Sequence, residues 1–234
     1  MKKVGIIIFA VALIIGLVMS NLFSFGRTSS RFFNFSMDFG GVHGSGNVAS
    51  EKRDISGFKS VDVGGVFQVE ITAQKEFSVE VLADDNLLPL IKTEVDGDTL
   101  RIETEKRLKS SNPIIVRISA PDIDDLDVSG AANVTVNNIK NEGLTVGGSG
   151  ASKIAVTGET AKLTVDVSGA TKVDAENLKA ENASIDASGA SKVSVNVTGE
   201  LRTEASGASK IVYTGTPQSV ENDTSGASRV TQKQ

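Results

Sequence analysis

Two groups of carboxylates are the residues most able to do chemistry in this sequence. They are Asp84 with Asp85, and Asp122 with Asp124, Asp125 and Asp127. Two acids held about 5–10 Å apart around a sugar would suit glycoside hydrolysis, and several oxygens together would suit calcium. However, Asp85 fits a helix cap, residues 122–125 fit a turn after Pro121, and the spacing matches no calcium-binding loop. We therefore expect structural roles for both groups.

Other catalytic arrangements find little support in the composition. The chain has one histidine, His43, and no cysteine. One histidine in a glycine-rich stretch makes neither a triad nor a metal cage alone, so we interpret His43 as an ordinary exposed residue. We predict a protein that is not an enzyme, with no catalytic residue, no cofactor and no metal ligand assigned.

The feature that must position every other residue is a repeat. Ser-Gly-Ala occurs six times, with glycines at 130, 150, 169, 189, 207 and 226. A fixed period near 20 residues is typical of stacked-unit proteins. Within each unit, apolar or small residues alternate with polar ones, which predicts strands with one face inward. Recurrent glycine and abundant β-branched residues disfavour helices.

These units predict an all-β fold, a parallel β-helix with rungs of about 18–20 residues. Each rung would comprise a strand, a bend at the glycine, a second strand and a polar return loop. Equivalent residues would stack about 4.8 Å apart. Glycine suits the bend because it adopts positive φ readily and carries no Cβ to crowd the next rung.

The alternation also predicts two exposed charged columns. The acidic column lies three residues before the glycines and comprises Asp127, Asp166, Asp186, Glu204 and Asp223. The basic column lies three residues after them and comprises Lys153, Lys172, Lys192, Lys210 and Arg229. The favoured interpretation is that charge keeps the sheet soluble and blocks lateral strand pairing. A metal or polyanion site along one column is the alternative.

Residues 51–128 read as less regular strands, with 10 basic and 17 acidic residues. Strands are predicted near 58–63, 67–72, 77–83 and 113–120, with a hairpin at Asp96-Gly97. Residues 84–91 predict a short capped helix with Pro89 in its first turn. Residues 61–71 align without gaps on 126–136, which places Gly65 about three rungs from Gly130. We therefore predict one solenoid domain over 44–234, with irregular first rungs in 44–128 and regular repeats in 129–234.

The N-terminus predicts export. Residues 4–25 are mostly apolar after Lys2 and Lys3, so residues 1–25 form a signal peptide or a transmembrane anchor, followed by a Phe/Gly-rich linker over 26–43. An uncleaved single-pass anchor is favoured, and secretion or a periplasmic location after cleavage is the alternative. Either places the solenoid outside the cytoplasm. No basic patch is large enough to predict nucleic-acid binding.

Several segments together resemble a known family. They are Gly44-Ser45-Gly46-Asn47-Val48, Arg53-Asp54-Ile55-Ser56-Gly57-Phe58, Phe67-Gln68-Val69-Glu70-Ile71, Ala83-Asp84-Asp85-Asn86-Leu87-Leu88, Asp96-Gly97-Asp98-Thr99-Leu100 and the repeated Ser-Gly-Ala-Ser-Lys. From about residue 44 to the C-terminus, the chain is similar to the putative auto-transporter adhesin, head GIN domain family. The resemblance implies a right-handed β-helical domain of bacteria outside the cytoplasm, with no established catalytic residues.

Three functions remain open at this point. The leading one is adhesion, envelope scaffolding or ligand binding, with an unknown protein or glycan of the cell envelope as the partner. The second is a polysaccharide-active β-helical enzyme, which short rungs disfavour because they leave little room for a cleft. The third is an envelope signalling partner. If a discrete site exists, we expect it in the acidic rungs between residues 51 and 128.

Overall fold

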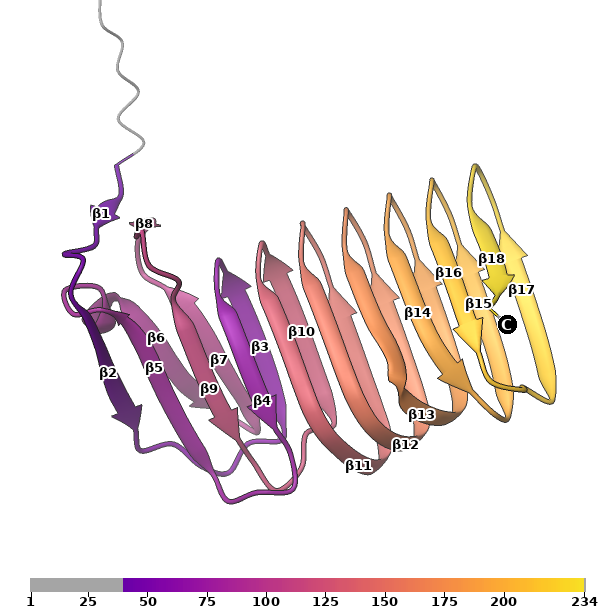
Figure 1. Ribbon diagram of the computed structural model, residues 1–234, viewed down its shortest axis with the longest axis horizontal. Helices are drawn as coiled ribbons and strands as arrows, with labels where there is room; N and C mark the ends of the chain where they lie inside the picture. Colours follow the sequence, from indigo (N-terminus) through magenta and orange to yellow (C-terminus); the bar gives the residue numbers. More distant parts are fainter. Residues whose placement is uncertain (1–39, 234) are drawn as a thin grey trace, which may run out of the picture. The chain divides into compact units, whose positions relative to one another are not determined.

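The computed structural model describes residues 40–233, so the signal or anchor predicted in residues 1–25 lies outside the described part. Within that part the chain is an all-β solenoid of stacked parallel strands, as predicted (Figure 1). Its one helical element is a single 3-10 turn, and no described helix has the length and apolarity to cross a membrane. The right-handed sense stays a prediction of the resemblance.

Nine strands build the regular half of the solenoid. They are β10 (Asp125–Gly130), β11 (Asn133–Gly148), β12 (Lys153–Val167), β13 (Lys172–Ala187), β14 (Lys192–Val197), β15 (Glu200–Ala205), β16 (Lys210–Thr214), β17 (Ser219–Thr224) and β18 (Arg229–Gln232). We call the broad side formed before each glycine bend side A, and the side formed after it side B. The long strands β11, β12 and β13 begin on side B, turn a corner and continue on side A.

The register confirms the predicted rung length. Lys153 pairs with Lys172, Lys172 with Lys192, and Lys192 with Lys210, which are steps of 19, 20 and 18 residues. Equivalent inward positions therefore form columns of aliphatic side chains. One on side A comprises Val61, Leu126, Val146, Val165 and Ile185, and one on side B comprises Val69, Val134, Ile154, Val173, Val193 and Ile211. All are at most 2% exposed, so the core is a continuous aliphatic stack.

The glycine bends stack as the sequence predicts. Gly189 has φ +73°, a conformation that L side chains rarely adopt, and a Cβ added there would lie 2.6 Å from the carbonyl oxygen of Gly169. The next residue completes the ladder, since the Ala190 N–H donates to that same oxygen at 2.8 Å. The bend therefore needs glycine both for its backbone angle and for the close approach of the neighbouring rung.

A second column at the bend is made of buried hydroxyls. The residue two places after the glycine is Ser152, Thr171, Ser191 or Ser209, and each is at most 2% exposed. Thr171 and Ser191 donate to the carbonyl oxygens of Ser168 and Ser188, at 2.9 and 2.8 Å. The last serine of Ser-Gly-Ala-Ser thus closes its own turn from inside.

The irregular half contributes two more rungs in an order that the sequence did not reveal. Its strands are β3 (Ser60–Gly65), β4 (Gln68–Thr72), β7 (Thr99–Thr104) and β9 (Ile115–Ser119). Side A runs β7, β3, β10 and side B runs β9, β4, β11, all parallel. The rung of β3 and β4 therefore lies between a later rung and the regular repeats.

This order corrects the predicted distance between Gly65 and Gly130. The two glycines are directly paired, one rung apart, and the alignment of 61–71 on 126–136 is their common register. Residues 73–124, between β4 and β10, are an insertion that builds the outer rung and most of the cap. Matching apolar patterns stack next to each other whatever their separation in sequence.

The cap closes the N-terminal end of the stack with antiparallel strands. β2 (Val48–Arg53) pairs with β5 (Ser78–Asp84), β5 pairs with β9, and β6 (Ile91–Asp96) pairs with β7 through the predicted Asp96-Gly97 hairpin. β1 (Val42–His43) pairs with β8 (Leu108–Lys109) in a separate two-stranded parallel sheet. Phe58 and Phe77 lie under this cap with ring centroids 5.1 Å apart.

The predicted capped helix over 84–91 is wrong in part. Only Leu88–Leu90 forms a 3-10 turn, η1, with Pro89 near its start, and no side chain caps it. Asp85 is engaged elsewhere, because its carboxylate accepts hydrogen bonds from Ser45 Oγ and from the Asn86 N–H.

Candidate binding surfaces

The acidic column forms on side A in the predicted register, with one interruption. Asp127 pairs with Gly147, which pairs with Asp166, and Asp186, Glu204 and Asp223 follow. In the other direction Asp62 extends the column and pairs with Arg101, whose Nε lies 3.9 Å from the Asp62 carboxylate. We call residues 62, 127, 166, 186, 204 and 223 the acidic ladder.

Burial and neighbouring like charges raise the pKa of two acids in the acidic ladder. Partial burial raises the pKa of Asp186, and the carboxylates of Asp166 and Glu204 in the adjoining rungs raise it further. Partial burial also raises the pKa of Asp62, with a further contribution from Asp127. The ladder is therefore a row of mutually repelling acids. Arg101 relieves part of this charge at Asp62, and Arg202 relieves part of it at Glu204, at 3.3 Å.

The acids predicted around residues 122–127 do not converge on one point. Asp122 accepts from the Ile123 N–H at 2.9 Å in a turn, while Asp125 and Asp127 lie in β10. Burial raises the pKa of Asp125, and Asp127, Asp124 and Asp98 add to the effect. Within residues 40–233, no group of three or more His, Cys, Asp or Glu side chains is arranged to hold a metal ion.

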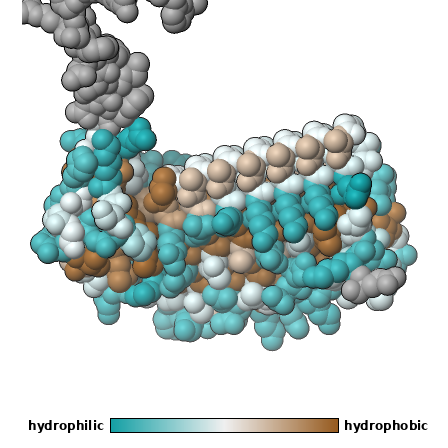
Figure 2. Space-filling model, turned by 45° about the horizontal axis from the view of Figure 1, so that its top comes forward, coloured by the Kyte–Doolittle hydropathy of each residue, from teal (hydrophilic) through white to brown (hydrophobic). Residues whose placement is uncertain are grey.

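The basic column forms on side B without interruption. Lys153, Lys172, Lys192, Lys210 and Arg229 pair in one register, and all five are exposed. We call these five residues the basic ladder. Figure 2 shows a row of hydrophilic side chains that runs beside the ridge of small residues along the stack. The two ladders flank the glycine bends on opposite broad sides, so the solenoid has an acidic side and a basic side.

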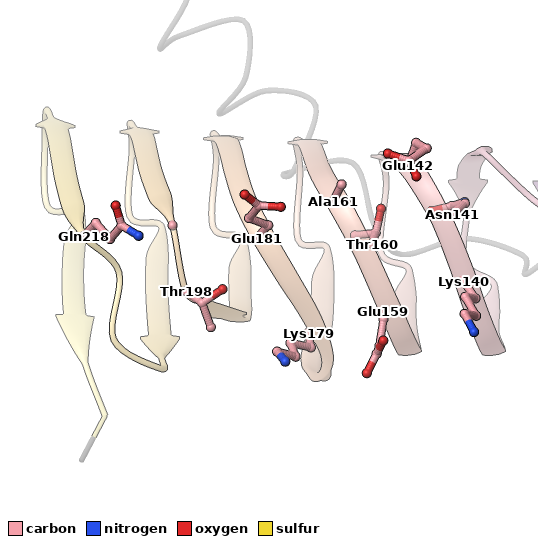
Figure 3. Close-up of a pocket in the computed structure, with 11 residues that line it drawn as sticks. Lys140, Asn141, Glu142, Glu159, Thr160, Ala161, Lys179, Glu181, Thr198 and Gln218 are labelled. Carbon is pink, nitrogen blue, oxygen red and sulfur yellow. The ribbon is translucent and has the colours of Figure 1, made fainter.

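A shallow groove crosses the rungs at the corner opposite the glycine bends. Its residues were not among those predicted from the sequence. It encloses about 720 Å³ and contains side chains from neighbouring corners (Figure 3): Lys140 and Glu142, then Glu159 and Thr160, then Lys179 and Glu181, with Thr198 and Gln218 beyond them toward the C-terminus. Lys140, Glu159 and Lys179 pair in register, so the sign of the charge alternates along one column of the groove. The groove is open to solvent, so it suits an extended polar segment better than a small enclosed substrate.

Asp84 and Asp85 do not form a catalytic pair. The Asp84 side chain is 1% exposed and accepts hydrogen bonds from Asn112 Nδ2 at 2.7 Å and Ser110 Oγ at 2.8 Å. These bonds, Asn112 first, lower the pKa of Asp84. Asn86 donates to the His43 carbonyl at 2.7 Å and accepts from the Ser45 N–H at 2.9 Å. The segments 44–48 and 83–88 are therefore joined to each other, and His43 is exposed.

Comparisons with known proteins agree with this architecture. The family model described as "Putative auto-transporter adhesin, head GIN domain" matches residues 57–217. A search of curated proteins found no match.

Solved structures share the fold. A putative adhesin of Bacteroides fragilis NCTC 9343 has a TM-score of 0.69 and 18% identity, covering 82% of this chain and 100% of its own. A putative adhesin of Parabacteroides distasonis ATCC 8503 has a TM-score of 0.53 and 20% identity, with 83% and 100% covered. A protein of the same strain, described as a putative lipid binding protein, has a TM-score of 0.50 and 17% identity, again with 83% and 100% covered. Since the family model spans more than half of the sequence, the chain belongs to the putative auto-transporter adhesin, head GIN domain family.

Proposed function

We propose that this chain is a non-enzymatic binding module that acts outside the cytoplasm, at the bacterial cell envelope, in adhesion or scaffolding. The observation that carries the proposal is the register of the outward side chains. Like residues repeat on successive rungs, about 4.8 Å apart, and form long flat rows. Such rows match a partner that also repeats its chemical groups, as envelope polymers and surfaces do.

Three lines support the location and the role. The apolar segment 4–25, after two lysines, favours export or a membrane anchor. The family carries the name adhesin, and so do two of the solved structures compared above. The cap strands pair with β7 and β9 of the outer rung, and the charged ladder residues of the regular half are exposed.

The same geometry disfavours the polysaccharide-active enzyme. Asp84 and Asp85 serve the cap, and the acids of β10 lie along a strand instead of facing one another across a cleft. Sugar sites commonly stack aromatic rings on the ligand. The one aromatic residue of the regular repeats, Tyr213, is half-buried against the core. Binding through rows of charged and polar groups fits the described surface better.

The test measures binding of the full-length chain to isolated bacterial envelopes and intact cells. We compare it with a variant in which six ladder residues are changed to serine: Lys172, Lys192, Lys210, Asp166, Asp186 and Glu204. The control changes six exposed charged residues of the first half to serine: Lys52, Lys75, Lys106, Asp54, Glu76 and Glu94. Both variants keep the net charge of the wild type.

The proposal expects saturable binding that is lost in the variant with six serines in the two ladders and retained in the control. If wild type, six-serine variant and control bind equally, or if neither the wild type nor the control binds, the proposed function is overturned. Release of oligosaccharides from the envelopes during incubation favours the enzyme instead. Capture of one stoichiometric membrane polypeptide, independent of the ladders, favours an envelope signalling partner.

A further inference from the structure

We propose that the basic ladder binds a linear anionic polymer that carries phosphate or carboxylate groups. The inference rests on the proposed binding function and names the surface and the chemistry of its ligand. The first observation is the uneven distribution of charge. The whole chain carries a formal net charge of −5, yet five cations lie in one unbroken row on side B.

The cations of the ladder have few acidic neighbours. Among residues 40–233, Lys172 alone of the five makes an ion pair, with Asp174 at a marginal 4.0 Å. The nearby carboxylate of Glu176 pairs with Lys233, at 2.8 Å, and is also attracted by Lys192 of the ladder. The adjoining column on side B is largely half-buried and comprises Thr135, Ala155, Asp174, Ser194, Val212 and Thr231, so it holds one acid. Most of the ladder's charge is therefore available to a ligand.

The geometry of the row selects a linear ligand. Neighbouring cations are held about 4.8 Å apart by the ladder of backbone hydrogen bonds, so they repel one another and cannot move apart at their Cα atoms. An anion placed between two rungs attracts both. A polymer with closely spaced anions repeats this contact along the stack and releases the counterions that both partners held. A single small anion meets no enclosure on this side and gains only one such contact.

The surroundings of the ladder argue against nucleic acid and against lipid. Proteins that hold single-stranded nucleic acid stack its bases on aromatic side chains, and the one aromatic residue near the ladder, Tyr213, packs against the core. Insertion into a membrane needs exposed apolar side chains. The large exposed ones of the described chain are Val48, Val66, Val95 and Val220, none of them in the ladder or the column beside it.

The experiment measures the affinity of the full-length chain for two immobilised polymers, a long-chain polyphosphate and a polyuronate, over a range of salt concentrations. The ladder variant changes Lys153, Lys172, Lys192 and Lys210 to glutamine. The matched control changes Lys52, Lys59, Lys75 and Lys106 to glutamine, which gives the same net charge with the ladder intact. Single-stranded DNA of equal charge is a third ligand.

Counterion release sets the expected numbers. Five neutralised cations on a flexible polyanion correspond to a slope of log affinity against log salt of about −3.5, which falls to about −0.7 in the ladder variant. The control keeps the steep slope. Preference for polyphosphate or for polyuronate identifies phosphate or carboxylate as the natural group.

Equal slopes for wild type and ladder variant, equal losses in ladder variant and control, or stronger binding to DNA than to both polymers overturn the inference. Its failure is distinguishable from that of the proposed function. Envelope binding that survives the change of the four lysines to glutamine, but is lost when six residues of both ladders become serine, overturns the basic ladder as the site and leaves the function standing. Polymer binding without any envelope binding overturns the proposed function and leaves the basic ladder standing as a polyanion site.

Discussion

Asp84 accepts a hydrogen bond from the side-chain amide of Asn112 at 2.7 Å, across 28 residues of sequence. Ser110 donates to the other oxygen of the same carboxylate at 2.8 Å. A Cβ on Gly44 would collide with this carboxylate, so the chain entering the fold passes directly over it. One buried acid thus joins the end of β5, the loop after β8 and the glycine-rich segment 44–47.

The first prediction concerns acid unfolding. Asp84→Asn should lower the melting temperature at pH 7, because an amide accepts fewer hydrogen bonds and its NH2 group would face the donor of Asn112. The pKa of Asp84 is lowered in the fold, so its contribution is complete above the unfolded value of about 3.9 and is lost as pH falls through the folded value. The gap in melting temperature should therefore close below about pH 3.9.

Thermal unfolding followed by circular dichroism from pH 2.5 to 7 measures this gap. The exposed Asp54 gives the matched control, since Asp54→Asn should leave the melting temperature nearly unchanged throughout. A gap for Asp84→Asn that stays constant with pH would show that shape, and not charge, is what the cap requires.

The second prediction separates the two reasons for glycine at the bend. Gly189 and Gly57 have similar angles, φ +73° and +83°, but a Cβ at Gly57 meets nothing within 4 Å. Alanine at either position bears the backbone penalty of about 1–2 kcal/mol. Gly189→Ala should cost at least about 2 kcal/mol more than Gly57→Ala, because its Cβ enters the backbone of the Gly169 rung. Denaturant unfolding measures both, and equal losses would mean that the rungs separate freely.

The regular half could be predicted from sequence because each rung repeats the same local pattern of glycine, apolar and charged residues. The period of the glycines, the alternation around them and the charged columns all reappear in the observed register. Local pattern and stacking agree there, since the residues on either side of each glycine bend meet their own equivalents in the next rung.

The first half could not be predicted in the same way, because its neighbours are distant in sequence. The alignment of 61–71 on 126–136 contains their register, but nothing local indicates that Gly65 and Gly130 lie in adjacent rungs while β7 occupies the far side of β3. The burial of Asp84 was missed for a similar reason. Its partners Ser110 and Asn112 lie in a loop whose position depends on the cap. The corner groove was missed because most of its residues lie where β11, β12 and β13 turn from side B to side A, a part of each repeat that the sequence pattern predicts as a polar return loop.

The third prediction concerns the hydroxyls inside the bends. Ser191→Ala should destabilise the fold by about 1 kcal/mol, because the Ser188 carbonyl loses a donor at 2.8 Å in a buried site. The smaller side chain itself is tolerated at this position, since Ala132 occupies it in an earlier rung with 1% exposure. Ser184→Ala, on the exposed face of β13, is the control and should change the unfolding free energy by less than about 0.5 kcal/mol. Similar losses of unfolding free energy at both sites would mean that the hydrogen bond from the buried hydroxyl does not stabilise the bend.

The fourth prediction runs opposite in sign to the first. Burial, with the carboxylates of Asp166 and Glu204, raises the pKa of Asp186 in the fold. A raised pKa means that the charged form costs stability above the folded value, and that this cost disappears as pH falls toward the unfolded value of about 3.9. Asp186→Asn should therefore stabilise the fold at pH 7 by a few tenths of a kcal/mol, since the site is largely exposed.

The gain from Asp186→Asn should shrink as the solution is acidified and vanish below about pH 3.9, where both states of the wild type hold the proton. Added salt should also reduce it at pH 7, because exposed like charges are screened. Urea unfolding at several pH and salt values measures both trends. A loss of stability at pH 7 would mean that the acidic ladder makes favourable contacts that outweigh its repulsion. Asp186 would then hold its neighbours together instead of keeping the sheet charged at a small cost in stability.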